Sequence, residues 1–247
     1  MGLAFDTIFT GAASGVWTNA SNWTAGVPIA GENVLIPPGS RTIDCTGMSD
    51  LALAALVISP GNHNPIGTSA NPLTSSFTAF LDHQGDGKLW FTNGAGTTPL
   101  VTIRSKAPVG GARADSFSVA GSNMTRIEIL SSNGTIAAGG TIASALIDGP
   151  SSVTIDADSD AITEMIQRAG DVVSARLVTR LIQGPGATWR QQVAEAITTV
   201  DVGGTLVYES NETIGTMRVH RGGFLDLMQN RENTVTLTTA TFYPGSR

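Results

Sequence analysis

The chain has 247 residues, a formal net charge of −6 and 14% charged residues, well below the ~25% of an average soluble domain. Its Lys and Arg residues are scattered singly, and because a phosphate backbone is bound by concentrated positive charge, nucleic acid is not expected as a partner. No run approaches the ~20 apolar residues of a membrane span, and the single cysteine, Cys45, excludes an intrachain disulfide.

Small and β-forming residues dominate, and helix-favouring Lys and Glu are scarce, so the chain is expected to be all-β. We divide it into an N-terminal arm at 1–15, a cap with the first rungs at 16–58, rungs with inserted loops at 59–116, and a regular β-solenoid at 117–247. The arm is apolar and alternates weakly, which suits a strand that packs on a neighbour. The alternative for it is a disordered terminus.

Residues 15–43 carry the most distinctive pattern. Trp17 and Trp23 lie on either side of Asn22, and Gly-Val-Pro, Gly31-Glu-Asn and the strand Val34-Leu-Ile-Pro-Pro-Gly follow. This stretch, together with the closing Phe-Tyr-Pro-Gly at 242–245, resembles bacterial and bacteriophage β-helical surface or virion structural proteins. A domain family named for its eight glycines carries a similar stretch, in which an Asp is usual at the position of Glu32 here. The resemblance implies the start of a solenoid rather than an activity.

The two tryptophans of this motif can act as a cap. Large aromatic rings over the open end of the first rung bury much apolar area and shield strand edges, so we assign Trp17 and Trp23 as capping residues. The alternative is an aromatic pair that stacks on a sugar.

Two polar, Pro- and Gly-rich segments interrupt the rungs, at 59–78 and 104–115. Long loops on a rigid scaffold often carry contacts, so we expect these loops to bind a partner. The alternative is passive decoration. The candidate contact residues are His63, Asn64, Pro65, Arg104, Lys106 and Arg113.

A ladder of apolar anchors, 17 or 19 residues apart, runs through the rest of the chain. Its members are Leu100, Phe117, Ile136, Val153, Val172, Trp189, Leu206, Leu225 and Phe242. A second series precedes them by five to seven residues: Ile129, Ile147, Ile166, Ile182, Val200, Val219 and Leu237. A repeat of ~18 residues with two strands in constant phase predicts a single-stranded β-helix, or β-solenoid. The alternative is a β-sandwich with evenly spaced strands.

Five apolar runs end in a Pro/Gly turn, as expected of equivalent solenoid corners. They are Val34-Leu-Ile-Pro-Pro-Gly, Leu56-Val-Ile-Ser-Pro-Gly, Leu146-Ile-Asp-Gly-Pro, Leu181-Ile-Gln-Gly-Pro-Gly and Thr241-Phe-Tyr-Pro-Gly.

The most enzyme-like cluster is Asp82-His-Gln-Gly-Asp86, where paired carboxylates with a histidine could do acid/base work on a glycan. A polar turn before a strand explains the same residues more simply, so we assign no catalytic residue and do not expect an enzyme. No two His or Cys residues fall at ligand spacing, so no metal or cofactor is expected.

Low charge and a solenoid end that needs covering favour a component of a larger assembly. The expectation is a bacteriophage virion protein, either capsid cement or decoration or a spike or fibre part. It would be assembled in the host cytoplasm without a signal segment, would be trimeric, and would contact other virion proteins. The rivals are a bacterial cell-surface adhesin that binds glycans and a polysaccharide-degrading β-helix enzyme.

Overall fold

The computed structural model describes residues 3–104, 115–121, 123–137, 139–157, 161–192, 196–227 and 234–247. The fold is all-β, a parallel β-solenoid of about 10 turns with rungs about 19 residues apart, as the sequence predicts. Its strands pair in parallel, which rules out the alternative of a β-sandwich built from antiparallel sheets. The only helix in the described ranges is η1 (Ala20–Asn22), a single 3-10 turn.

The chain forms two compact units. We call Met1–Ile127 with Ser131–Gly134 the N-terminal unit, and Glu128–Leu130 with Thr135–Arg247 the C-terminal unit. The division falls within β8 (Met124–Leu130) and β9 (Asn133–Ile136).

Parallel pairing orders the strands of the N-terminal unit. These are β1 (Thr7–Ile8), β2 (Asn33–Ile36), β3 (Leu51–Ile58), β4 (Leu73–His83), β5 (Leu89–Asn93), β6 (Thr98–Ile103) and β7 (Phe117–Gly121). β1, β2, β3, the C-terminal half of β4 and β6 follow one another in one stack. β5 instead pairs with the N-terminal half of β4 and with β7.

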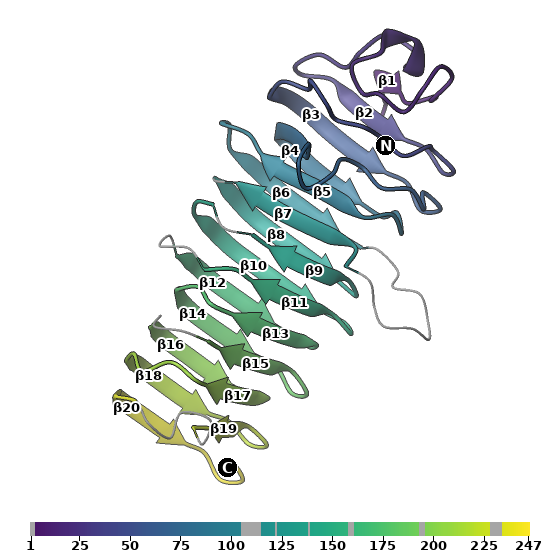
Figure 1. Cartoon of the computed structure of the whole chain (residues 1–247). Coiled ribbons are helices and arrows are strands. Elements are labelled where there is room, and N and C mark those ends of the chain that lie inside the picture. Colours follow the sequence, from purple (N-terminus) through teal and green to yellow (C-terminus); the bar gives the residue numbers. More distant parts are fainter. Residues whose placement is uncertain are drawn as a thin grey trace. The chain divides into compact units, whose positions relative to one another are not determined.

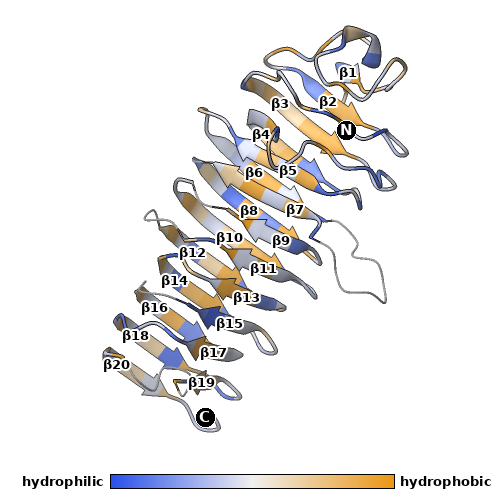
Figure 2. Ribbon diagram, viewed as in Figure 1, coloured by the Kyte–Doolittle hydropathy of each residue, from blue (hydrophilic) through white to orange (hydrophobic). Residues whose placement is uncertain are grey.

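Register stacks the inward side chains of the N-terminal unit into columns. Two of these columns are Val34–Leu56–Leu81–Val101 and Ile36–Ile58–His83–Ile103. Every member is fully buried. Alternate residues of a strand face opposite sides, so each strand sends every second side chain into the core. Figure 2 shows the hydrophobic residues concentrated on the strands, with hydrophilic positions between them.

The C-terminal unit holds two ladders of parallel strands, which Figure 1 shows as two rows of arrows. One ladder consists of β10 (Ile142–Asp148), β12 (Ile162–Gln167), β14 (Val178–Gln183), β16 (Ile197–Val202), β18 (Ile214–Val219) and β20 (Leu237–Phe242). The other consists of β11 (Ser152–Ile155), β13 (Asp171–Ser174), β15 (Thr188–Gln191), β17 (Thr205–Tyr208) and β19 (Phe224–Asp226).

Most of the predicted ladder is confirmed in register. Val153, Val172, Trp189, Leu206 and Leu225 are direct partners on the five strands from β11 to β19. Because each member lies over the last, the first four are buried to within 2% exposure. The spacing in sequence is therefore the length of one turn, and it repeats because parallel strands keep the same register.

The ends of the predicted ladder are wrong. Leu100 lies in β6, which pairs with β4 rather than with the strand of the next anchor, Phe117. Phe242 lies in β20 opposite Val219, so it belongs to the ladder that runs from β10 to β20. Strands of both ladders recur at the same spacing, so the period alone does not say to which ladder a residue belongs.

The second series identifies the correct strands but does not form one column. Ile166 and Ile182 are partners, whereas Val200 lies opposite Leu181 and Met217. The shifts within a strand run from one position, as at Val200, to five, as at Leu237, which pairs with Ile214, and they leave the average spacing nearly unchanged, so the spacing does not reveal them.

The predicted Pro/Gly corners directly follow β2, β3, β10, β14 and β20, as expected. Their glycines have φ between 68° and 86°, the left-handed region in which glycine alone is unstrained. They are Gly39 after β2, Gly61 after β3, Gly149 after β10, Gly186 after β14 and Gly245 after β20.

Candidate functional site

Successive turns of the N-terminal unit bring three loops to one corner. Ile58, His83 and Ile103 are register partners at the ends of β3, β4 and β6, so the loops that follow these strands leave the sheet at the same place. A hollow with a volume of about 420 Å³ lies there, and we call it the corner hollow. It is lined by Pro60, Gly61, Gln84, Asp86 and Arg104.

Asp82 positions two of the polar side chains of the corner hollow. Its Oδ1 lies 3.3 Å from Nε of Arg104, and its Oδ2 accepts a hydrogen bond from Nε2 of Gln84 at 2.5 Å. Only 15% of the Asp82 side chain is exposed, against 51% for Arg104. Within the described ranges, the terminal nitrogens of Arg104 and Oε1 of Gln84 have no hydrogen-bond partner. The hollow therefore presents both donors and acceptors.

Asp86 adds a second carboxylate, and its backbone is tied to the loop of the preceding turn. Nδ1 of His63 lies 3.2 Å from Oδ2 of Asp86, with side-chain exposures of 70% and 34%. The backbone amides of Asp86 and Gly87 both donate to the carbonyl of Asn62, at 2.8 and 3.0 Å. A Cβ on Gly87 would lie 2.1 Å from the carbonyl oxygen of Asn64, so only glycine fits this turn. The corner is thus preorganised by backbone contacts.

The structure brings some of the predicted contact residues together. Arg104 lines the corner hollow, and His63 pairs with Asp86 at its wall. Asn64 and Pro65 instead tie adjacent turns, because Nδ2 of Asn64 donates to a carbonyl of the preceding loop at 2.8 Å and the carbonyl of Pro65 accepts from the Ile43 amide at 2.9 Å. Lys106 and Arg113 lie outside the described residues. Partner binding by this group stays a prediction.

The loop predicted at 59–78 is shorter than expected. β4 begins at Leu73, so residues 73–78 belong to a rung. Ile66, within the loop, is fully buried and bridges Ile43 and Leu89 on the neighbouring turns. A single apolar side chain among polar residues was enough to keep this segment in the stack, and no periodicity marked it.

His83 is buried in a column of isoleucines behind the corner hollow. It is fully buried and faces backbone groups of Gly87 and Ser116, but within the described ranges neither ring nitrogen reaches hydrogen-bond geometry. Burial penalises the charged ring and lowers the pKa of His83 to about 4, against the weaker opposing effect of those backbone groups. A neutral histidine facing the core is not available to chemistry at the surface.

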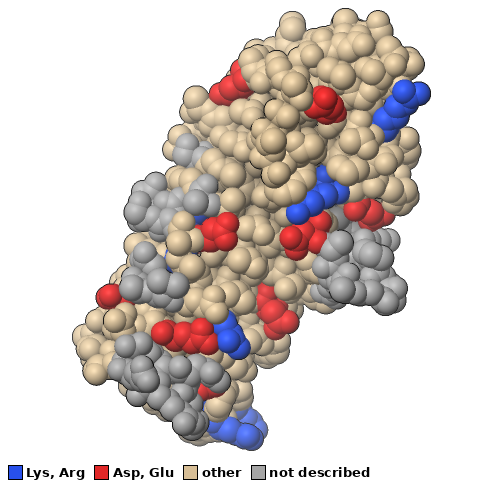
Figure 3. All heavy atoms as spheres, viewed as in Figure 1, with Lys and Arg blue, Asp and Glu red and all other residues tan. Residues whose placement is uncertain are grey.

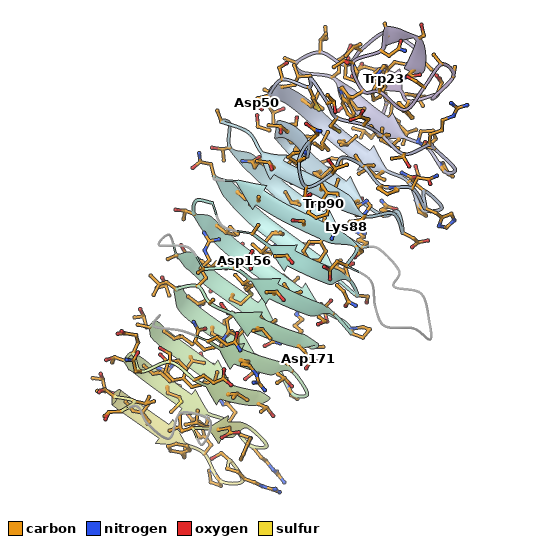
Figure 4. All side chains as sticks on the ribbon, viewed as in Figure 1. Trp23, Asp50, Lys88, Trp90, Asp156 and Asp171 are labelled. Atoms are coloured by element: carbon orange, nitrogen blue, oxygen red, sulfur yellow. The ribbon has the colours of Figure 1, made fainter. Side chains whose placement is uncertain are left out.

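Trp17 and Trp23 form an aromatic cluster with Phe9. The tryptophan ring centroids lie 4.7 Å apart, and that of Trp23 lies 5.1 Å from Phe9. Nε1 of Trp23 donates to the backbone carbonyl of Trp17 at 2.7 Å. The two indoles are 0% and 5% exposed, so neither can stack on a sugar unless the cluster opens. By contrast Trp90 is partly exposed, with Nζ of Lys88 4.1 Å from its ring centroid (Figure 4).

The last strand of the C-terminal unit exposes apolar side chains. Phe242 on β20 is 53% exposed, Tyr243 beyond it 43%, and Phe224 on β19 42%. Val219, the register partner of Phe242 on the preceding turn, is fully buried, whereas Thr205 opposite Phe224 is partly exposed and the ring of Tyr243 stacks on His220 with centroids 5.2 Å apart. The columns whose side chains are buried at β18, Met217 and Val219, therefore continue at β20 with the exposed residues Ala240 and Phe242. We call Phe224, Phe242 and Tyr243, together with the edge of β20 that faces away from β18, the terminal apolar surface.

Charge is sparse and mixed over the rest of the surface. Figure 3 shows acidic and basic side chains on the face drawn in small groups, some of opposite sign side by side, with wide uncharged areas between them. Several of these charges pair between turns, as Arg180 does with Glu164 at 2.8 Å. The described part of the chain has no group of three or more His, Cys, Asp or Glu residues placed to hold a metal ion. It also has no helix long and apolar enough to cross a membrane.

Comparison with known proteins leaves the function to be argued from these residues. No protein family, no curated protein and no solved structure matches the chain.

Proposed function

We propose that this chain is a non-enzymatic structural protein of a bacteriophage virion, either capsid cement or decoration or a part of a spike or fibre, which acts through protein–protein contacts. The resemblance of residues 15–43 to bacteriophage and bacterial β-helical proteins supports the choice of particle. The observation that carries the assembly role is the terminal apolar surface.

A strand edge with exposed aromatic rings is suited to strand addition. β20 pairs with β18 on one side, and within the described residues its other edge has no strand partner. An added strand would satisfy those backbone groups and bury Phe242 together with Ala240, which lies over the fully buried Met217. Such an exposed edge favours association with another polypeptide.

The partner that suits this edge is a second copy of the chain. The sequence of β20, Leu-Thr-Thr-Ala-Thr-Phe, has no charged residue, so two copies can meet without like-charge repulsion. A two-fold axis would place the two β20 edges side by side and bury the same aromatic residues of both copies. A partner that recognises charged groups would find no charged side chain on β20.

Native mass tests the contact directly. Light scattering behind a sizing column is expected to give a multiple of 25.5 kDa, twice that value for edge-to-edge pairing and three times it for the predicted trimer. Phe242→Asp should shift the species to the monomer, because a carboxylate cannot be buried unpaired in an apolar contact. Thr198→Asp adds the same charge at an exposed position of β16, two strands before β20 in the same ladder, and serves as a matched control that should keep the native mass of the wild type. A monomer at all concentrations, for the wild type, would contradict self-association.

Two further measurements test the virion assignment and the absence of catalysis. Peptide mass spectrometry of purified phage particles from the source of this gene should recover the chain at a stoichiometric level, and its absence from them would overturn the assignment. Incubation with polysaccharides should release no new reducing ends. Release by the wild type that is lost in Asp82→Ala or Asp86→Ala would establish the rival enzyme instead.

A further inference from the structure

The corner hollow has the size and the rigidity of a small-molecule site. Its volume of about 420 Å³ falls in the ~300–1,000 Å³ range of ligand pockets. Its walls come from three successive turns, and the amide of Arg104 donates to the carbonyl of His83 at 2.7 Å. With the Asn62 carbonyl holding Asp86 and Gly87, binding would order little additional backbone.

The polar groups of the hollow suit hydroxyl groups. The Arg104 guanidinium offers free N–H donors, and Oε1 of Gln84 and Oδ1 of Asp86 are acceptors without partners in the described ranges. A sugar hydroxyl donates and accepts at once, so two adjacent hydroxyls can bridge such a donor and acceptor pair. The ring of Pro60 supplies an apolar wall for the C–H face of a sugar.

The charge of the hollow selects among ligands. Asp82 and Asp86 bring two carboxylates against one guanidinium, and Asp82 already faces the guanidinium at 3.3 Å. An anionic ligand would meet the carboxylates of both Asp82 and Asp86, whose nearest basic groups, Arg104 and His63, already face them, so phosphate or an acidic sugar is disfavoured. A neutral polyhydroxylated ligand keeps the ion pair and adds hydrogen bonds.

We infer that the corner hollow binds a neutral saccharide through two adjacent hydroxyl groups, with Arg104 as donor and Asp86 and Gln84 as acceptors. Asp82 is a positioning residue, since it holds Arg104 and Gln84 in place. This site is separate from the terminal apolar surface and from the buried tryptophans. It would give a structural solenoid a means of contacting neutral surface polysaccharide.

The test is calorimetry and array binding with neutral glucose-, galactose- and mannose-based oligosaccharides, beside sulfated and sialylated ones. The wild type is expected to bind at least one neutral oligosaccharide at millimolar concentration or below. Arg104→Ala should weaken that binding at least tenfold, because charge-assisted hydrogen bonds are lost. Arg180→Ala is the matched control, since its side chain is 50% exposed against 51% for Arg104 and also pairs with a carboxylate.

Several outcomes would overturn the inference. They are an absence of binding to every neutral oligosaccharide, a preference for acidic ones, or equal affinity in the Arg104 and Arg180 variants. Failure here is distinguishable from failure of the proposed function, because Arg104→Ala should keep the native mass of the wild type. Phe242→Asp should conversely keep saccharide affinity. Far-UV circular dichroism of each variant checks that the solenoid is intact.

Discussion

Replacement of Trp17 by alanine is expected to destabilise the N-terminal unit strongly. The Trp17 side chain is fully buried and packs edge-on against Trp23, so truncation removes a large apolar group and leaves a cavity. Trp→Ala substitutions in cores typically cost about 3–5 kcal/mol. Trp17→Phe should cost far less, because it keeps a ring and removes an indole N–H that has no partner among the described residues.

The assay is urea unfolding followed by far-UV circular dichroism. With the slope of about 1–3 kcal/mol per molar urea usual for small proteins, the loss in Trp17→Ala should lower the midpoint by about 1 M or more. Trp90→Ala is the matched control within the same unit. Its ring is partly exposed and contacts Lys88, a contact worth about 0.5–1 kcal/mol at such sites.

Two results would refute this reasoning. If Trp17→Ala and Trp90→Ala lowered the midpoint equally, burial in the aromatic cluster would not be the source of stability. If Trp17→Phe were as damaging as Trp17→Ala, the indole N–H rather than the packing would matter.

Three further predictions follow from single buried positions. The folded-state pKa of His83, about 4, lies below its ordinary value of 6.5, so its contribution to stability is complete above pH 6.5 and declines as the pH falls toward 4. At ~1.4 kcal/mol per pKa unit, the loss in free energy of unfolding should total about 3 kcal/mol. The variant His83→Ile, which matches the other members of its column, should abolish that part of the pH dependence when urea titrations at pH 7 and pH 4.5 are compared. An unchanged pH dependence in this variant would contradict the assignment. Gly87→Ala should lower the thermal midpoint and cost at least about 1–3 kcal/mol, because its Cβ would overlap the backbone of Asn64, and an unchanged midpoint would show that the turn can open. Burial raises the pKa of the Cys45 thiol to about 12, so a thiol reagent at pH 8 should react only as fast as the protein unfolds, whereas immediate labelling of the native protein would contradict this burial.

Much of the fold could be predicted because each turn of a solenoid repeats the same pattern of apolar residues and corner residues along the sequence. The column from Val153 to Leu225 repeats at a steady spacing, and Pro/Gly corners recur after β2, β3, β10, β14 and β20. The pattern assigns Phe242 to the wrong ladder, because both ladders repeat with the same period. It also misses Ile66, a single apolar residue that keeps a polar loop paired with the neighbouring turns.

The corner hollow could be predicted only in part. The sequence places Asp82 and Asp86 in one polar cluster and Arg104 among the candidate contact residues of another loop. Nothing in the sequence joins Asp82 to Arg104, because they are 22 residues apart and meet only through the pairing of β4 with β6. His83 belongs to the same polar cluster in sequence, whereas its position at the end of β4 turns its side chain into the core.

The sequence by itself determined the class of architecture: all-β rungs of nearly constant length, corners at Pro and Gly, and a low surface charge. These properties depend on residues close together in the chain, where propensity and alternation act. The tertiary structure decided which residues from different turns share a column, a corner or a surface. A parallel register shift of a single residue would turn Asp82 inward and His83 outward, and it is long-range strand pairing, invisible to local pattern, that sets this register.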